Sequence, residues 1–146
     1  LYKKFQAPIL PCISIEAAED YTRYGIIGGE NMGEGIMKMN TIVEKPGIDN
    51  APSNLASIGG YLLTPEIFSY LKKALVNLDE KNEFQIQPAM RSMMEDGKSF
   101  FGCELTNSKY YDTGNKLEYL KTVVDFALKH NDIKNEFRSY LKSVVQ

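Results

Sequence analysis

The sequence predicts an α/β protein in which a mixed sheet is closed by helices at the C-terminal end of the chain. Short apolar runs with the two-residue alternation of strands fill the first part of the chain. Segments with the spacing of helices alternate with these runs and then occupy the end of the chain. The 146 residues contain no internal repeat, low-complexity stretch or linker, so we expect one domain.

The first part of the chain contains several segments with strand character. In CISIEAA, Ile13 and Ile15 alternate with polar residues, and RYGII is a second short run that ends at the glycine pair beginning at Gly28. The glycine-rich stretch GGENMGEG predicts a turn, which would pair RYGII antiparallel with IMKMNTIVE. Residues 55–63, LASIGGYLL, are apolar enough for a buried strand, although the two glycines weaken it.

Helical spacing dominates the remainder of the chain. Thr64 caps a helix that has Pro65 at its first position, and PAMRSMMEDG predicts a second helix that ends at Gly97 with its methionines inward. SFFGCEL and KYYD have the character of short strands. NKLEYLKTVVDFALKHN then predicts a long helix, with Asn115 as its cap and Glu118 completing a variant of the capping box. NEFRSYLKSVV predicts the last helix.

Composition and charge exclude several classes of function. The net charge of −2 and the scattered basic and aromatic residues argue against nucleic-acid binding, and no apolar window is long enough to span a membrane. Cys12 and Cys103 lie far apart and form no C-x-x-C pair, which indicates reduced thiols in a cytoplasmic protein. The chain opens on Leu1 without a signal or transit pattern, and we expect it to be a piece of a longer protein.

An acid and a base stand side by side at the end of IMKMNTIVE. Pro46 restricts the preceding Lys45 to extended conformations and cannot donate to a ladder, so the strand should end here. Glu44 and Lys45 would then point to opposite faces, but the twist of a strand end lets both heads converge on one ligand. A carboxylate accepts hydroxyl hydrogens and an ammonium neutralises a phosphate oxygen, so the pair suits a sugar phosphate. A solvated ion pair is the alternative reading of these residues alone.

A second candidate is Asp112, in YYDTGNK, just before the long predicted helix. A carboxylate there can hold a hard cation such as Mg²⁺, although no second ligand stands nearby in the sequence. The alternative is a turn residue that binds backbone amides. Asp-Thr-Gly also occurs in aspartic proteases, but the helix predicted after Asn115 does not fit that site. His130 lies near a predicted helix end with no catalytic partner, and we assign it no catalysis.

Five segments together carry a family resemblance. YGII, VEKP, APSNLASIGGYLL, NEFQIQPAM and DTGNKLEYLKTVVDFALKHN resemble, in order and spacing, the C-terminal half of bacterial UTP–glucose-1-phosphate uridylyltransferases, also called UDP-glucose pyrophosphorylases. The likeness runs from about Tyr24 to the C-terminus. It implies part of a Rossmann-like nucleotidyltransferase fold. Residues 1–146 would form the C-terminal sugar-phosphate-binding portion of a single nucleotidyltransferase domain, without its N-terminal nucleotide-binding portion.

The resemblance also implies an activity and a site. The activity is transfer of the uridylyl group from UTP to glucose 1-phosphate with Mg²⁺, which gives UDP-glucose and pyrophosphate. The backbone of Gly25 would approach the sugar hydroxyls, Glu44 would accept their hydrogen bonds, and Lys45 would hold the sugar phosphate as the catalytic cation. The main chain around Ser57 would complete the sugar pocket, and Gly59 would permit close packing beside it. The resemblance makes Asp112 a magnesium ligand. Strands left unpaired in a partial fold favour association, so we also expect a homo-oligomer, in the cytoplasm that the reduced thiols indicate.

Two departures from the family pattern limit this reading. The family commonly shows DEIQLTDA where this chain has NEFQIQPA, so any role for Asn82, Gln87 or Pro88 is in doubt. The glycine-rich nucleotide loop of the family does not occur in the sequence, so we expect the chain to be inert by itself. Two rival hypotheses stand beside uridylyl transfer. One is a related sugar nucleotidylyltransferase that uses dTTP, ATP or CTP. The other is a non-catalytic sugar-nucleotide-binding or assembly module with the C-terminal helices as its oligomer interface.

Overall fold

The computed structural model describes residues 1–76 and 84–145. These form two compact units, Leu1–Asn107 and Ser108–Gln146. Asn82, at which the sequence departs from the family pattern, lies outside the described residues. Every described strand belongs to the first unit, and the second unit contains helices α4 and α5.

The elements follow one another in this order. The first unit contains α1 (Tyr2–Phe5), β1 (Ile9–Ser14), β2 (Gly25–Gly33), β3 (Ile36–Glu44), β4 (Leu55–Ser57), α2 (Ile67–Val76), α3 (Gln87–Glu95) and β5 (Phe100–Glu104), with 3-10 turns at Asp20–Thr22 and Ile48–Asn50. The second unit contains α4 (Lys116–Lys129) and α5 (Lys134–Val144).

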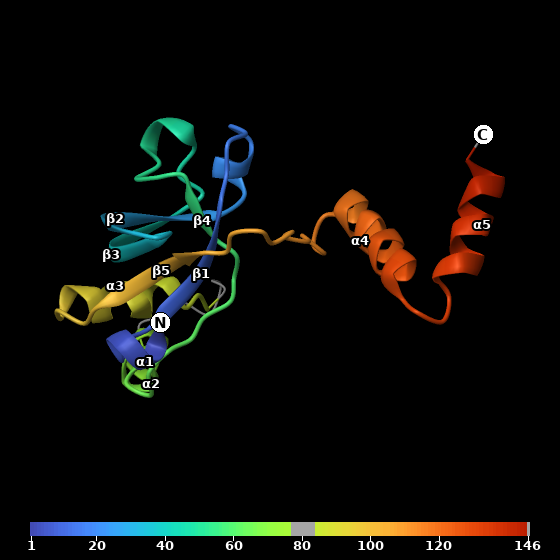
Figure 1. Cartoon of the computed structure of the whole chain (residues 1–146). Helices are drawn as coiled ribbons and strands as arrows, with labels where there is room; N and C mark the ends of the chain where they lie inside the picture. Colours follow the sequence, from blue (N-terminus) through green and yellow to red (C-terminus); the bar gives the residue numbers. More distant parts are fainter. Residues whose placement is uncertain (77–83, 146) are drawn as a thin grey trace. The chain divides into compact units, whose positions relative to one another are not determined.

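The strands form one mixed sheet, as predicted. Their order is β1–β4–β2–β3–β5, and β5 returns to β1, so that the strand order closes on itself (Figure 1). β1 and β5 run parallel. The other neighbouring strands are antiparallel. The α/β class is therefore confirmed, whereas the closure depends on the β1–β5 pairing between distant segments and was not predicted.

The β2–β3 hairpin confirms the predicted antiparallel pairing but corrects the predicted turn. Strand β2 continues through the glycine-rich stretch to Gly33, and only Glu34 and Gly35 form the connection. Both have positive φ, +53° and +71°, as the two-residue turns favoured in hairpins require. Gly28 and Gly29 instead allow close approach of neighbouring atoms to the strand. At Gly28, a Cβ would lie 2.6 Å from the Cβ of Pro52.

Of two further predicted strands, one is shorter than expected and the other does not form. The strand expected over residues 55–63 is limited to Leu55–Ser57, and only an isolated bridge at Leu62 follows. Gly59 has a φ of +74°, which ends the extended run. KYYD forms no strand, because its tyrosines lie in an irregular segment. There, Lys109 and Tyr111 donate hydrogen bonds to a carboxylate on α4.

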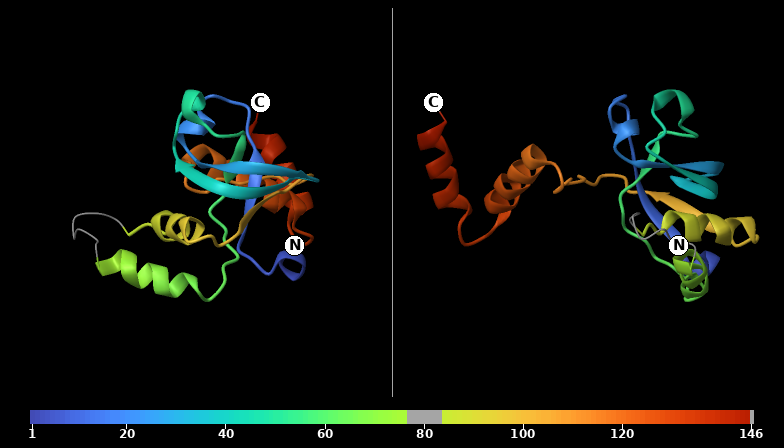
Figure 2. Two further views of the ribbon diagram at one scale, coloured as in Figure 1. Left: turned by 90° about the vertical axis from the view of Figure 1, so that its left-hand side faces the viewer. Right: turned by 180° about the vertical axis from the view of Figure 1, so that it is seen from behind.

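Helices α2 and α3 lie beside one another on the same side of the sheet, as the two directions of view in Figures 1 and 2 show. The inward methionines of α3 are confirmed, since Met90 and Met93 are fully buried. Helix α2 begins at Ile67, later than predicted, and Ile67 is buried. In contrast to Ile67, the α2 side chains of Phe68 and Leu75 are 66% and 58% exposed.

The two cysteines are free, as predicted, with Cys12 on β1 and Cys103 on the neighbouring strand β5. Cys12 is buried, and burial raises the pKa of its thiol to about 12. The thiol therefore stays protonated and behaves as a small apolar group in the core.

In the second unit, the predicted cap of α4 is confirmed. The side-chain oxygen of Asn115 accepts hydrogen bonds from the backbone N–H groups of Leu117 and Glu118, at 3.0 and 3.2 Å. The predicted role of Glu118 in a capping box is wrong, because its side chain pairs with Lys121 at 2.7 Å and the N–H of Asn115 donates to the carbonyl of Asp112. Among the helices of the described ranges, none combines the length and the apolar character needed to cross a membrane.

Candidate functional site

Three neighbouring strands place a glycine between two polar residues. Gly25 on β2 stands opposite Glu44 on β3 and opposite Ser57 on β4. Residues directly opposite one another in an antiparallel ladder share a face of the sheet. Because Gly25 has no side chain, the Glu44 carboxylate occupies space that a side chain there would take. We call this feature the Gly25 notch.

The carboxylate of Glu44 leans over the notch. A Cβ at Gly25 would lie 3.0 Å from Glu44 Oε2, so glycine is what allows the carboxylate its place. The other oxygen, Oε1, lies 3.8 Å from the Lys45 Nζ. The Glu44 and Lys45 side chains are 40% and 58% exposed, so a ligand can reach both heads. The structure therefore brings together the acid and the base predicted from the sequence.

The backbone of Lys45 differs from its prediction. Lys45 is not extended, because its φ is +48° and strand β3 ends at Glu44. Its N–H donates to the carbonyl of Tyr24 at 3.1 Å, and the N–H of Gly47 donates to the carbonyl of Tyr21 at 3.1 Å. These bonds hold the chain in a turn that overrides the preference imposed by the following proline. A left-handed residue other than glycine costs roughly 1–2 kcal/mol, and such strain clusters at functional sites.

Ser57 and Tyr61 form the buried side of the notch. Ser57 is buried, and its hydroxyl has no hydrogen bond of standard geometry to any residue in the described part of the chain. Burial raises the pKa of Tyr61; the nearby Ser57 hydroxyl partly offsets this rise, and the charge of Glu44 adds to it. Tyr61 therefore keeps its proton at neutral pH and remains a hydrogen-bond donor beside the carboxylate.

Two side chains of this site were not predicted. Tyr61 lies in the apolar run LASIGGYLL, which was interpreted as core strand. Gln87, the first residue of α3, donates a hydrogen bond from Nε2 to Glu44 Oε2 at 3.4 Å. No local pattern marks this contact, because it joins residues 43 positions apart in the sequence.

The remaining residues predicted from the sequence are Gly59 and Asp112. At Gly59, no described atom lies within 4 Å of the position of a Cβ, so its φ of +74°, not close packing within the chain, selects glycine. Asp112 belongs to the second unit. Its Oδ1 accepts a hydrogen bond from the N–H of Gly114 at 3.0 Å, and its carbonyl accepts one from Asn115 at 3.3 Å.

The metal ligand predicted in the second unit is the carboxylate of Asp112. Across residues 1–76 and 84–145, no group of three or more His, Cys, Asp or Glu side chains gathers as a metal site. Magnesium is commonly bound by one or two carboxylates together with substrate phosphates and water. The hard oxygen of Asp112 fits such a partial ligand set, and its role as a magnesium ligand stays a prediction.

Comparison with known proteins identifies the family. Residues 2–128 match the family described as nucleotidyl transferase. The chain belongs to the nucleotidyl transferase family. It is 38% identical over 124 residues to the UTP–glucose-1-phosphate uridylyltransferase of Streptococcus pneumoniae serotype 4. It is 40% identical over 124 residues to uridylyltransferase 2 of Streptococcus pyogenes serotype M1. Each alignment covers 84% of this chain and 40% of the relative, so the chain spans about two fifths of their length.

Solved structures give the same result for the fold of this nucleotidyl transferase chain. A UTP-bound UGPase from Acinetobacter baumannii has a TM-score of 0.81 at 27% identity, over 98% of this chain and 47% of the other. A UDP-glucose pyrophosphorylase complexed with UDP-glucose has a TM-score of 0.76 at 35% identity, over 88% of this chain and 47% of the other. The resemblance to UDP-glucose pyrophosphorylases and the nucleotidyltransferase fold are therefore confirmed.

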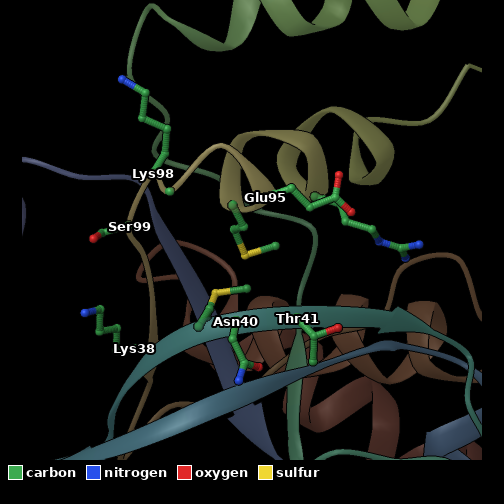
Figure 3. A pocket seen from close by; sticks show the side chains of 10 residues that line it. Lys38, Asn40, Thr41, Glu95, Lys98 and Ser99 are labelled. Carbon is green, nitrogen blue, oxygen red and sulfur yellow. The ribbon is translucent and has the colours of Figure 1, made fainter.

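The chain also has a cavity of about 410 Å³ between β3 and the C-terminal part of α3. Figure 3 shows Asn40 and Thr41 on the strand, Glu95 on the helix, and Lys98 and Ser99 after it. None of the residues predicted from the sequence as site residues lines this cavity. The ammonium of Lys98 already pairs with a Glu66 oxygen at 2.7 Å. The Gly25 notch is therefore the better candidate for the functional site.

Proposed function

We propose that this chain works in the transfer of the uridylyl group from UTP to glucose 1-phosphate, which gives UDP-glucose and pyrophosphate, and that it binds the sugar phosphate. The observation that carries the proposal is that the side-chain heads of Glu44 and Lys45 lie 3.8 Å apart, with Glu44 Oε2 against the side-chain-free Gly25. The names of the relatives support it, since they include uridylyltransferases and a pyrophosphorylase complexed with UDP-glucose.

The chemistry of the notch suits a sugar phosphate. The carboxylate of Glu44 accepts hydrogen bonds from sugar hydroxyls, and the absent side chain of Gly25 leaves room for that carboxylate beside the backbone. Lys45 neutralises phosphate charge, which lowers the repulsion between two anionic substrates as they approach. In nucleotidyl transfer this positioning and neutralisation provide most of the catalysis. We keep the backbone around Ser57 and Gly59 as the remaining wall of the pocket.

The proposal includes a magnesium ion, with Asp112 as one of its ligands. A carboxylate oxygen of Asp112 would bind the ion, and the ion would neutralise charge on the phosphates of the substrates. Residues 1–146 are proposed as the C-terminal sugar-phosphate-binding portion of a nucleotidyltransferase domain. The coverage of 40% of the relatives' length supports this assignment.

Location and assembly complete the proposal. The free thiols of Cys12 and Cys103 support a reducing compartment, for which we propose the cytoplasm. Tyr140 and Val144 are 59% and 55% exposed on α5, and such apolar side chains support a homo-oligomer. Light scattering of the purified chain at several concentrations measures its mass, and a monomer at all of them contradicts the oligomer.

Binding to this chain tests the proposed substrate. Calorimetric titration with glucose 1-phosphate is expected to give saturable binding that Lys45→Ala and Glu44→Ala each weaken about tenfold or more, because each removes a charged hydrogen-bond partner. Lys72→Ala, on the exposed face of α2, is the matched control and should bind as the unchanged chain does. No saturable binding by the unchanged chain, or an equal loss in the control, contradicts the proposal.

Activity tests the choice of nucleotide. A form of the protein extended to the length of its relatives is supplied with UTP, dTTP, ATP or CTP together with glucose 1-phosphate. We expect the highest kcat/KM with UTP, and a higher value with another nucleotide would favour a related sugar nucleotidylyltransferase. The chain of 146 residues alone should give no turnover. Turnover that Lys45→Ala abolishes would contradict that expectation.

A further inference from the structure

Helix α3 presents two polar side chains to strand β3. Gln87 Nε2 donates to Glu44 Oε2 at 3.4 Å, and a guanidinium nitrogen of Arg91 donates to the carbonyl of Ile42 at 3.3 Å. Residues four apart on a helix lie about 6 Å apart along its axis, and residues two apart on a strand lie about 6.6 Å apart. The two contacts are therefore in register, and together they fix the first turns of α3 against the end of β3.

The hydrogen bond from Gln87 is made to the carboxylate of Glu44, the acidic group of the Gly25 notch. Within the described residues, Glu44 Oε1 faces the ammonium of Lys45 at 3.8 Å, whereas Oε2 accepts from Gln87 and stands against Gly25. One donor therefore faces each oxygen of the carboxylate. A carboxylate with a donor on each oxygen loses the freedom to rotate about its last torsion, which is otherwise broad.

We propose that Gln87 is a positioning residue that orients the Glu44 carboxylate for sugar hydroxyls. What Glu44 binds rests on the function proposed above, whereas the contact itself does not. An amide suits this task because it donates a hydrogen bond without neutralising the carboxylate, as a second cation would. Each carboxylate oxygen has two lone-pair positions, so Oε2 accepts from Gln87 and from a ligand hydroxyl together. Gln87 thus acts through Glu44 and need not contact the ligand.

A measurement without ligand tests the contact. In ¹⁵N spectra of the chain, the side-chain NH₂ signals of Gln87 are expected to shift when Glu44→Gln removes the charged acceptor. Glu95→Gln removes a carboxylate from the same helix at a place that Gln87 does not contact, and it serves as the control. Equal Gln87 signals in the unchanged chain and in Glu44→Gln overturn the proposal, whatever the chain binds.

A double-mutant cycle, with ligand binding as its readout, tests the positioning role of Gln87. Gln87→Met keeps the length of the side chain but removes the donor, and we expect glucose 1-phosphate to bind about three- to tenfold more weakly. In a Glu44→Gln background the same substitution should change binding less than about twofold, because coupled residues are not additive. Gln87→Glu should weaken binding more than Gln87→Met, since it places a second carboxylate beside Glu44. Inorganic phosphate, which has no sugar hydroxyls, should bind equally to the unchanged chain and to Gln87→Met.

Ser92→Met controls for the introduced side chain, because Ser92 lies on the exposed face of α3. A loss in Ser92→Met equal to that in Gln87→Met overturns the inference, as does an equal effect of Gln87→Met with and without the Glu44 carboxylate. If the unchanged chain binds no glucose 1-phosphate, the proposed function fails, and the ligand-free spectra alone decide whether Gln87 holds Glu44. The two failures are therefore distinguishable.

Discussion

Lys45 occupies a backbone conformation that its own side chain disfavours. With φ at +48°, it carries the strain of a left-handed residue that has a Cβ, roughly 1–2 kcal/mol. Glycine removes that strain but adds about 0.5–1 kcal/mol of chain entropy to the unfolded state. We therefore expect Lys45→Gly to raise the free energy of unfolding by about 0.5–1 kcal/mol relative to Lys45→Ala, as measured by urea denaturation.

The two variants are a matched pair, because each removes the ammonium and its exposed ion pair with Glu44. Both should lose glucose 1-phosphate binding to the same extent, while only the glycine variant gains stability. Such a result would show that the strain at Lys45 accompanies the placement of a functional side chain. Equal unfolding free energies for the two variants would contradict this account.

Tyr61 provides a pH-dependent prediction. Burial raises its pKa above the ordinary value of 10.0, and the charge of Glu44 adds to the rise. We expect ¹³C spectra of tyrosine-labelled chain to show the Tyr61 pKa lowered by Glu44→Gln and raised by Ser57→Ala, which removes the offsetting hydroxyl. The pKa of Tyr61 is higher in the folded than in the unfolded state, so protonated Tyr61 contributes to folding stability. This contribution is complete below pH 10 and is lost as the pH rises through the pKa of the folded state. A pKa of 10 or lower for Tyr61 would contradict the assignment.

Residue patterns predicted only the local part of the notch. Glu44 and Lys45 are neighbours in the sequence, so their chemistry was visible before any fold was known. Gln87, on α3, donates a hydrogen bond to the Glu44 carboxylate. Tyr61, in the segment after β4, has its pKa raised by the charge of Glu44. Such contacts depend on how distant segments pack, and residue spacing in a single sequence does not predict that packing.

At the scale of elements, the glycines of the sheet mark places of close approach. Gly102 on β5 stands beside β1 and β3, and a Cβ there would lie 2.1 Å from Ile27 Cδ1 in the core. We expect Gly102→Ala to lower the free energy of unfolding by about 1–3 kcal/mol through overpacking. Ile27→Val, which removes that methyl group, should cost about 0.5–1.5 kcal/mol alone.

The double variant Gly102→Ala/Ile27→Val is the informative one. It should be more stable than the sum of the two single effects predicts, because the deleted Cδ1 makes room for the added Cβ. Urea denaturation of the four proteins measures this coupling. Strict additivity would mean that the sheet relieves the overlap by moving its backbone, contrary to the packing described here.

The elements themselves were predicted best where periodicity is long. The helix that begins near Asn115 and the methionine-rich α3 were correctly anticipated, because each shows several turns of helical spacing. The glycine-rich end of β2 was interpreted as a turn, since a strand glycine and a turn glycine look alike without knowledge of the partner strand. The strand expected over residues 55–63 failed for the opposite reason, because apolar composition concealed the turn at Gly59.

At the scale of the whole molecule, every core cluster and every paired strand among the described residues lies in Leu1–Asn107. We therefore expect a chain that ends at Asn107 to fold by itself and to keep its amide spectrum in the sheet. It should also retain glucose 1-phosphate binding, because Gly25, Glu44 and Lys45 all lie within it.

The complementary chain, Ser108–Gln146, should behave differently. Its helices have 14 and 11 residues, and neither contains a buried residue. Isolated helices shorter than about 12–15 residues are marginal in water, so circular dichroism of this chain should show low helix content. Full helicity in that chain would contradict the prediction that its helices are marginal alone. An unfolded chain ending at Asn107 would contradict the prediction that the buried core is enough to fold the first unit. Loss of glucose 1-phosphate binding by a folded chain ending at Asn107 would instead place part of the sugar-phosphate site in residues 108–146.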